Sequence, residues 1–292
     1  MSATARLARP VVEAGAAGTM GTNQTAGARR IGEAFGRARS EDRVALVPYV
    51  VAGYPDAATS LRIALAAIDA GADVLEVGLP YSDPLADGAT LQRASQVALA
   101  AGATLEGSLH LIEEIAAARP STVVVPMGYA NQFLGGGDGA PAARRLVEAG
   151  TAGVIVADLT PDEGGPFEAD ARANGLALVY LVAPTTPAAR RATIAARSGG
   201  FLYCVSLVGV TGARSALPPS VGRLVRDVVA ASPVPVGVGF GVSKPAHVRA
   251  IARAGAGGVI VASALVDALG PEGTDIDAMA ALVKGLREAT GT

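Results

Sequence analysis

The chain has 292 residues, of which 50% are hydrophobic and 17% charged, and its formal net charge is −2 at pH 7. This length suits one large α/β barrel or two ordinary domains, and such a composition can fill a core without disulfides or metal ions. Acidic and basic residues are scattered, so nothing resembles a nucleic-acid footprint. No apolar run reaches the ~18 residues that suggest a membrane span, and the amino end lacks a signal-peptide pattern.

Histidine and cysteine are scarce. The two histidines, His110 and His247, fall in predicted surface helices, which argues against a histidine-based triad or a three-histidine metal site. We therefore expect no metal. The single cysteine, Cys204, makes no internal disulfide, which fits a cytoplasmic protein. It lies in an apolar run, so we expect a buried packing residue in preference to a nucleophile.

The first 30 residues are rich in Ala, Gly, Thr and Ser and have no sustained period. They are predicted to form a disordered extension, residues 1–30. Residues 31–292 contain no linker or composition shift and are predicted to form one domain. Ile31, Ala34 and Phe35 lie at helical spacing, so a short helix is expected to lead into this domain.

Short aliphatic runs then alternate with amphipathic segments, as in a parallel sheet that helices cover on both faces. The eight runs are Val44–Val51, Val74–Val77, Thr122–Pro126, Gly153–Ala157, Ala177–Val182, Phe201–Val205, Val234–Val238 and Gly257–Val261. Eight βα units in about 250 residues predict an α/β protein with a single (β/α)8 TIM barrel. The rival is a doubly wound sheet, whose glycine-rich dinucleotide turn would follow the first strand. That place instead reads Ala-Gly-Tyr-Pro-Asp.

The active site of such a barrel lies at the carboxyl ends of the strands. Glu76 lies inside the second predicted strand, where burial would raise the pKa of its carboxyl group and suit it to exchange a proton near neutral pH. The alternative is a structural carboxylate paired with a buried base. Neither neighbouring strand contains a Lys or Arg, which favours the functional interpretation.

The segment that follows Glu76, Pro80–Gly88, is too long for an ordinary connection between a strand and a helix. Such loops are usually lids or binding elements. The loop contains Asp83 and Asp87. On composition alone, either aspartate could equally be a turn or capping residue.

Short segments of small residues lie at the ends of the last three predicted strands. Val208–Ala213 follows the sixth and Gly237–Gly241 ends the seventh, both with glycines, and Val261–Ser263 follows the eighth and opens a short helix. Barrels often hold a phosphate between the last strand ends, where glycines let main-chain amides approach the anion. The alternative is that these glycines only serve tight turns. Apart from Arg214 and Lys244 no basic residue lies close in sequence, so amides would carry most of the binding.

These residues resemble the family of tryptophan synthase α subunits over about Ile31 to Leu269. The most specific motif is LEVGLPYSDPLADG, residues 75–88, which is similar to the family signature around a catalytic glutamate and aspartate. Shorter matches, in the same order and spacing, are Pro48-Tyr49, Tyr129–Asn131, Ala157-Asp158, Gly209–Gly212 and Gly239–Gly241.

The resemblance implies a lyase that splits indole-3-glycerol phosphate into indole and glyceraldehyde 3-phosphate in tryptophan biosynthesis. Glu76 matches the general acid/base, and Asp87 matches the carboxylate that holds the indole N–H and stabilises positive charge on the ring. Tyr203 matches a tyrosine beside the substrate. Other positions match the apolar indole pocket: Tyr49, Met127, Tyr129, Ile155, Phe240 and Ile260. Positions that match the phosphate site are Gly212, Gly241, Ala262 and Ser263, and Thr211 matches a further substrate-binding position.

The resemblance also implies a partner. The family passes indole to a β subunit that carries pyridoxal phosphate, in an α2β2 assembly, and no cofactor is expected in this chain. Two positions depart from the family pattern. Ala262 stands where glycine is common, which preserves the main-chain amide, and Gln132 stands where proline often follows Asn131, in a region that helps to contact the β subunit.

Three other functions are open at this stage. The chain could run the same reaction alone and release free indole, or it could be a catalytically silent barrel that acts only as an allosteric partner. Retention of both Glu76 and Asp87 argues against the silent barrel. A sugar-phosphate isomerase would be another phosphate-binding barrel, but it would not need the loop Pro80–Gly88 in this form.

Overall fold

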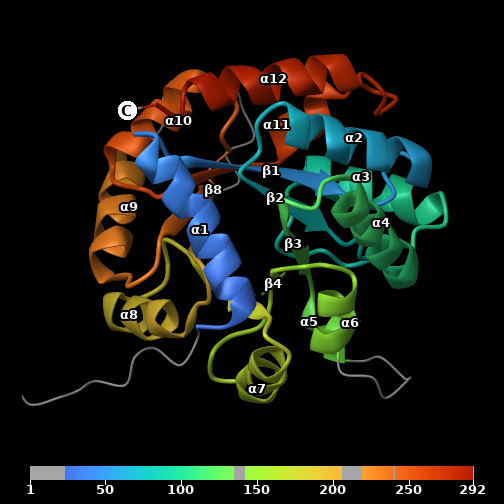
Figure 1. The fold of residues 1–292 in the computed structure, drawn as a ribbon. Coiled ribbons are helices and arrows are strands. Elements are labelled where there is room, and N and C mark those ends of the chain that lie inside the picture. Colours follow the sequence, from blue (N-terminus) through green and yellow to red (C-terminus); the bar gives the residue numbers. More distant parts are fainter. Residues whose placement is uncertain (1–23, 135–141, 206–218, 240, 292) are drawn as a thin grey trace, which may run out of the picture.

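The computed structural model describes residues 24–134, 142–205, 219–239 and 241–291. In this part of the chain, parallel strands alternate with helices that surround them (Figure 1). The strands are β1 Ala45–Val51, β2 Val74–Gly78, β3 Val123–Gly128, β4 Gly153–Val156, β5 Ala177–Val179, β6 Leu181–Val182, β7 Leu202–Val205, β8 Val236–Gly239 and β9 Gly258–Val261.

The sheet closes on itself. Its strand order is β5-β4-β3-β2-β1-β9-β8-β7-β6, and the two outermost strands, β5 and β6, are separated in sequence by Tyr180 alone. The run predicted as one strand, Ala177–Val182, is thus two short strands. The break has a local cause, because the Tyr180 amide donates to the hydroxyl of Ser198 and not to a neighbouring strand. The predicted TIM barrel is confirmed.

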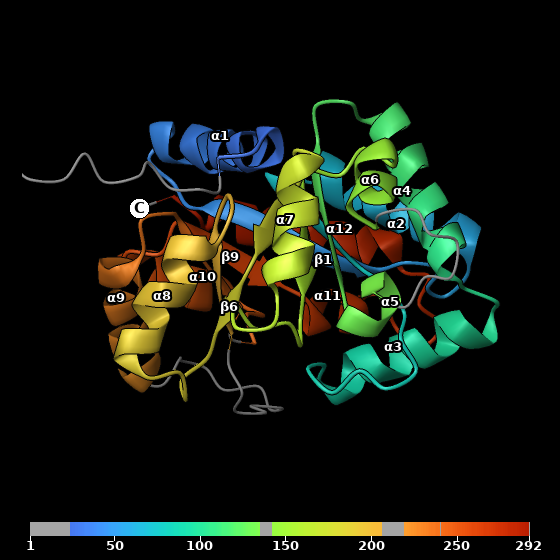
Figure 2. The same ribbon diagram turned by 90° about the horizontal axis from the view of Figure 1, so that it is seen from below.

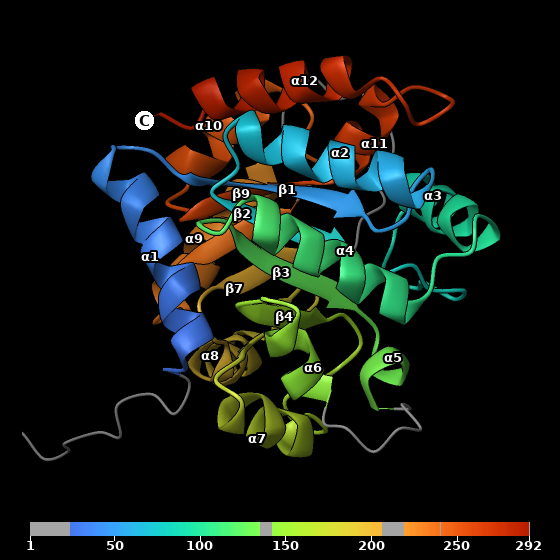
Figure 3. The same cartoon turned by 45° about the vertical axis from the view of Figure 1, so that its right-hand side comes forward.

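The helices pack outside the strands, and Figure 3 shows α2 and α4 side by side over β1, β2 and β3. The helices are α1 Ala26–Ser40, α2 Ala57–Asp69, α3 Ala89–Ala100, α4 Leu105–Ala118, α5 Ala130–Leu134, α6 Ala142–Glu148, α7 Gly165–Ala173, α8 Ala188–Arg197, α9 Pro219–Ala231, α10 Pro245–Arg253, α11 Ser263–Ala268 and α12 Ile276–Glu288.

Helix α1 begins at Ala26, five residues before the predicted domain boundary at Ile31. The hydroxyl of Thr25 accepts a hydrogen bond from the Ala28 amide at 3.0 Å and caps the helix. The boundary between an extension of residues 1–30 and a barrel of residues 31–292 therefore falls inside a helix. Residues 1–23, which carry most of the predicted disordered extension, lie outside the described residues.

Helix α1 covers the amino-terminal end of the barrel, away from α3 and α5 (Figure 2). Its buried residues Ile31 and Phe35 belong to the same apolar cluster as the inward-facing strand residues Val47 and Val125. The Phe35 ring stacks on Phe201 with centroids 5.4 Å apart. This end of the barrel is filled by side chains, so the accessible space is at the opposite end.

The alternation of side chains along β2 explains why a glutamate lies in the barrel. Leu75 and Val77 pack in the outer cluster between sheet and helices, and Val74 packs in the interior cluster. Successive side chains of a strand point to opposite faces, so Glu76 points inward with Val74. Residue 76 is fully buried.

Candidate active site

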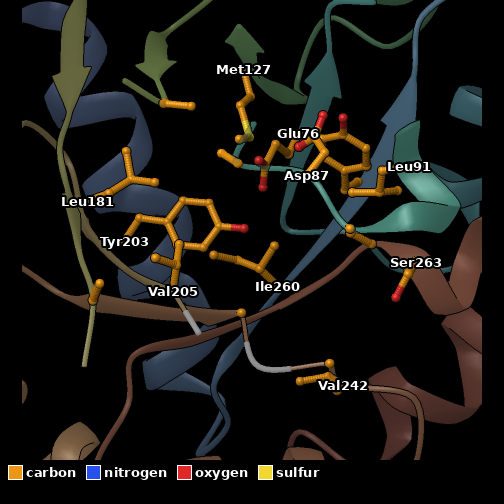
Figure 4. Close-up of a pocket in the computed structure, with 18 of the residues that line it drawn as sticks. Glu76, Asp87, Leu91, Met127, Leu181, Tyr203, Val205, Val242, Ile260 and Ser263 are labelled. Atoms are coloured by element: carbon orange, nitrogen blue, oxygen red, sulfur yellow. The ribbon is translucent and has the colours of Figure 1, made fainter. Parts of the chain in front are cut away.

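A cavity of about 380 Å³ opens at the carboxyl ends of the strands. Figure 4 shows Glu76 and Asp87 close together in it, with Tyr203 and Ile260 also on its wall. Its lining residues are Tyr49, Glu76, Ala86, Asp87, Gly88, Leu91, Met127, Ala157, Leu181, Val182, Ala183, Thr186, Tyr203, Val205, Gly239, Gly241, Val242, Ile260, Ala262 and Ser263. The cavity therefore joins the two predicted carboxyl groups to the glycine-lined rim.

Glu76 lies in register with Tyr49 of β1 and Val125 of β3, so neither adjacent strand offers a cation. Among the described residues, no group makes a hydrogen bond to either oxygen of its buried carboxyl group. Burial raises the pKa of Glu76 to about 8, and the charge of Asp87 adds to the rise. A buried carboxyl group without a partner is costly to the fold, which favours a chemical role over a structural one.

Asp87 reaches the same cavity from the loop between β2 and α3. Burial raises the pKa of its carboxyl group to about 6, which is lower than the pKa of Glu76. At neutral pH, Asp87 is therefore mostly ionised while Glu76 is mostly protonated. Two carboxyl groups whose surroundings separate their pKa values can act as an acid and as an electrostatic stabiliser in one site.

The apolar wall contains four of the residues that the resemblance assigns to the indole pocket or to the substrate: Tyr49, Met127, Tyr203 and Ile260. Burial raises the pKa of the Tyr49 and Tyr203 hydroxyls well above its usual value, so both stay neutral. Neutral aromatic and aliphatic side chains provide a surface that suits a flat, largely apolar ring.

Tyr129 and Ile155 do not line this cavity. Ile155 is fully buried in the interior cluster of the barrel. Tyr129 is buried with its ring stacked on Tyr81, at a centroid distance of 5.0 Å. The structure therefore places both residues behind the wall. Ile155 lies in the interior of the barrel, and Tyr129 lies beside the loop that carries Asp87.

The opposite rim of the cavity contains Gly241, Ala262 and Ser263, as predicted for main-chain contacts to a phosphate. Gly241 has a φ of 60°, a left-handed conformation that favours glycine and that turns the chain directly after β8. Thr211, Gly212 and Phe240, the other residues predicted to contact substrate at the last strand ends, lie outside the described residues.

Gly78 is a residue that sequence reasoning missed. A Cβ atom at this position would lie 1.8 Å from the Tyr49 hydroxyl oxygen, so only glycine leaves room for that ring at the end of β2. Gly239 has a related place beside the Tyr203 ring, where a Cβ would lie 3.0 Å from the Tyr203 hydroxyl. The two glycines let two tyrosines lie in the cavity wall.

Part of the wall had no predicted role. It comes from the loop after β2, the start of α3, the strands β6 and β7, and the segments that follow β4, β6 and β8: Ala86, Gly88, Leu91, Ala157, Leu181, Val182, Ala183, Thr186, Val205 and Val242. Gly239, at the end of β8, also lines the cavity and belongs to the predicted segment Gly237–Gly241. The signal in the sequence for most of these residues was a position in or after a predicted strand. That signal does not say which side chains face the opening.

A closed parallel barrel with two carboxyl groups of unequal pKa in a cavity at its carboxyl end has the architecture of a TIM-barrel enzyme. Comparison with known proteins narrows this class. The sequence model of the family "Tryptophan synthase alpha chain" matches residues 35–290. The tryptophan synthase alpha chain of Roseiflexus sp. (strain RS-1) is 46% identical over 263 residues, which cover 88% of this chain and 99% of the relative.

Another relative, the tryptophan synthase alpha chain of Mycobacterium ulcerans, is 45% identical over 83% of this chain and 89% of its own length. A solved structure of Mycobacterium tuberculosis tryptophan synthase superposes with a TM-score of 0.82 at 39% identity, over 90% of this chain and 98% of that chain. The chain belongs to the tryptophan synthase alpha chain family. It is a carbon–carbon lyase of tryptophan biosynthesis that cleaves indole-3-glycerol phosphate.

Three further features bear on the class of protein. The described residues hold no cluster of three or more His, Cys, Asp or Glu side chains that could bind a metal ion. In the same part of the chain, every helix is too short or too polar to cross a membrane. Cys204 is buried and unpaired, and burial raises the pKa of its thiol to about 12, so the prediction of a packing residue is confirmed.

Proposed function

We propose that Glu76 and Asp87 carry out the cleavage of indole-3-glycerol phosphate as a retro-aldol reaction. The observation that carries the proposal is the unpartnered carboxyl group of Glu76 inside a cavity that it shares with Asp87. A protonated Glu76 gives its proton to the indole ring carbon that bears the glycerol chain. The ring then carries positive charge, which extends to its nitrogen.

Glu76, now a carboxylate, takes the proton from the hydroxyl group on the adjacent chain carbon. That carbon becomes the aldehyde of glyceraldehyde 3-phosphate as its bond to the ring breaks, and the bonding electrons return to the ring. The proton donated first stays on the indole carbon, and the hydroxyl proton restores Glu76. A pKa raised to about 8 suits both steps, because near neutral pH the group can both give up a proton and take one back at little cost in free energy.

Asp87 stabilises the charged intermediate. With a pKa of about 6 it is mostly ionised at neutral pH, so it can accept a hydrogen bond from the ring N–H and face the positive charge as it develops. Both groups lie in a cavity with an apolar wall, where low polarity strengthens such an interaction. This assigns different tasks to two residues of the same chemical type.

The substrate would span the cavity from the acidic pair to the glycine rim. Its indole ring would contact Tyr49, Met127, Tyr203 and Ile260, and its phosphate would contact main-chain amides of Gly241, Ala262 and Ser263. The resemblance adds further contacts, namely Thr211, Gly212 and Phe240, with Tyr129 and Ile155 as supporting residues. Main-chain N–H groups at glycines and at the amino end of a helix can bind a phosphate without a basic side chain.

A β chain that carries pyridoxal phosphate would receive the indole, in an α2β2 assembly. Two large apolar side chains support a protein partner near the cavity mouth: Leu85, 84% exposed, and Leu134, 58% exposed. They lie on neighbouring segments, since Gln132 of α5 donates a hydrogen bond to the Pro80 carbonyl at 3.1 Å. We place the assembly in the cytoplasm, where the lone Cys204 would stay reduced.

Release of indole from indole-3-glycerol phosphate tests the proposed function. The purified chain is assayed alone and with a tryptophan synthase β chain, and Glu76→Gln is the matched control. We expect indole from the unmutated chain, a higher rate with the β chain, and very little indole from the variant. A full rate without any partner would indicate a lyase that works alone. Equal rates for the variant and the unmutated chain would show that the acid/base assignment is wrong.

A further inference from the structure

The loop between β2 and α3, residues 79–88, brings Asp87 into the cavity, yet side chains from other elements hold its main chain. In the described part of the chain, burial alone shifts the pKa of the Asp87 carboxyl group, and no hydrogen bond contributes to that shift. The place of this carboxyl group therefore depends on how the peptide units on either side of it are fixed.

Tyr129 fixes the peptide unit that joins Leu85 to Ala86, one residue before Asp87. Its hydroxyl oxygen accepts a hydrogen bond from the Ala86 amide at 3.0 Å. Its ring stacks on Tyr81 of the same loop, with centroids 5.0 Å apart and an angle of 22° between the rings. Tyr129 is buried and directly follows β3, so packing restricts its side chain and keeps both contacts in place.

Gln92 fixes the peptide unit after Asp87. Its side-chain amide, on the first turn of α3, donates to the Asp87 carbonyl at 3.0 Å. The amide of Asp87 itself donates to the Pro84 carbonyl at 3.0 Å, which closes a turn within the loop. Asp87 is thus flanked by two side-chain hydrogen bonds, one from the β3 side and one from α3.

We propose that Tyr129 is a positioning residue that acts through Asp87, and that Gln92 is its counterpart on the other side. This inference rests on the proposed function of Asp87. Tyr129 is absent from the cavity wall, so its contribution to the reaction runs through the Ala86 amide and not through contact with the substrate. The pair holds the carboxyl group of Asp87 at the distance from the ring nitrogen that the charged intermediate requires.

Tyr129→Phe is the sharpest probe, because it keeps the ring stacked on Tyr81 and removes only the acceptor for the Ala86 amide. Tyr81→Phe is the matched control. It deletes the same atom from the stacked partner, whose hydroxyl accepts a single hydrogen bond within the described residues, from the Asn131 side-chain amide at 3.5 Å. We expect Tyr129→Phe to lower kcat about tenfold with KM changed by less than about twofold, since small misplacements of a reacting group are costly. Tyr81→Phe is expected to leave both values near those of the unmutated chain.

A double-mutant cycle with Asp87→Asn separates positioning from a general structural role. If Tyr129 acts through Asp87, adding Tyr129→Phe to the Asp87→Asn variant costs less than about twofold in kcat. The same tenfold loss in both backgrounds would overturn the positioning proposal while leaving the role of Asp87 intact. A full rate for Asp87→Asn alone would instead overturn the proposed role of Asp87, and the positioning proposal with it.

Gln92→Met gives an independent variant that does not rely on the fold of Tyr129→Phe. It is similar in size and lacks the donor for the Asp87 carbonyl, so we expect the same loss of kcat and the same non-additivity with Asp87→Asn. Hydrogen exchange provides a second readout. We expect the amides of residues 85–88 to exchange faster in Tyr129→Phe than in Tyr81→Phe, and equal exchange in the two variants would contradict the proposal.

Discussion

Two buried glutamates in this barrel have opposite surroundings. Glu168, on α7 in the outer shell, accepts hydrogen bonds from Arg172 at 2.9 Å, from Arg197 at 2.9 Å and from the Tyr180 hydroxyl at 3.1 Å. Glu76, inside the barrel mouth, has no hydrogen-bond partner among the described residues. Both residues are almost completely shielded from solvent.

The difference teaches how to separate a structural carboxylate from a reactive one. A buried charge that is paired and hydrogen-bonded ties elements together, here α7, the end of α8 and the residue between β5 and β6. A buried carboxyl group that is left unpaired costs stability and keeps its proton to a higher pH. Such a group persists where its chemistry is used, so the comparison predicts opposite effects of the same substitution at the two sites.

The largest expected effect is on activity. Glu76→Gln removes the proton that the reaction needs, so kcat should fall about thousandfold. Glu168→Gln changes the same atoms in the outer shell and should leave kcat within about twofold at a temperature where the variant is folded. The measurement is indole formation from indole-3-glycerol phosphate by both purified variants. Comparable losses of kcat in the two variants would show that the two glutamates do not differ in role.

Stability should respond in the opposite sense. Glu168→Gln removes the carboxylate charge that the Arg197 guanidinium contacts, and because that arginine is partly exposed we expect a loss of about 2 kcal/mol in the free energy of unfolding. Glu76→Gln should not destabilise the fold at pH 7.5. Urea unfolding of both variants at that pH checks this, and a stable Glu168→Gln protein would count against the structural role.

The pH dependence of stability sharpens the contrast. The pKa of Glu76 is about 8 in the folded chain and near 4.5 when unfolded, so the folded chain binds more protons between these values and stability falls as pH rises. One such group gives a slope of up to about 1.4 kcal/mol per pH unit. We expect Glu76→Gln to flatten this slope between pH 6.5 and 7.5, measured by urea unfolding. An unchanged slope would argue against the raised pKa.

The smallest expected effect is on the pH–rate profile. Activity should rise as Asp87 ionises near pH 6 and fall as Glu76 loses its proton near pH 8. Since the charge of Asp87 contributes to the raised pKa of Glu76, the residual activity of Asp87→Asn should lose its alkaline limb at a lower pH, by less than about one unit. Profiles of kcat/KM for both proteins provide the measurement, and a limb that moves upward would contradict the coupling.

Much of the fold was readable from local patterns. Apolar runs of the right length predicted all the barrel strands, and the structure alters them mainly at their ends. The start of α1 was placed too late, because Ala26–Arg30 lack a strong apolar period and the helix depends on the cap at Thr25 and on contacts across the barrel end. Such contacts join residues far apart in sequence, so periodicity does not register them.

The candidate site was readable in part. An acidic residue within an apolar strand pointed to Glu76, and the family motif pointed to Asp87. Tyr129 was assigned to the indole wall, but its hydroxyl is turned to the Ala86 amide. Leu181 and Thr186 line the cavity from the segment after β5, which carries no motif. A motif identifies a position and not the direction of its side chain.

The sequence by itself determined the barrel strands and put Glu76 on the same face of its strand as Val74, because strand length and the two-residue alternation of side chains are properties of the chain. Only the tertiary structure decided that Glu168 is paired while Glu76 is not, and that Tyr129 holds a loop. Pairing, burial and pKa depend on groups that folding brings together from distant segments. The pKa of Glu76, for example, rises only when folding removes water from around its carboxyl group.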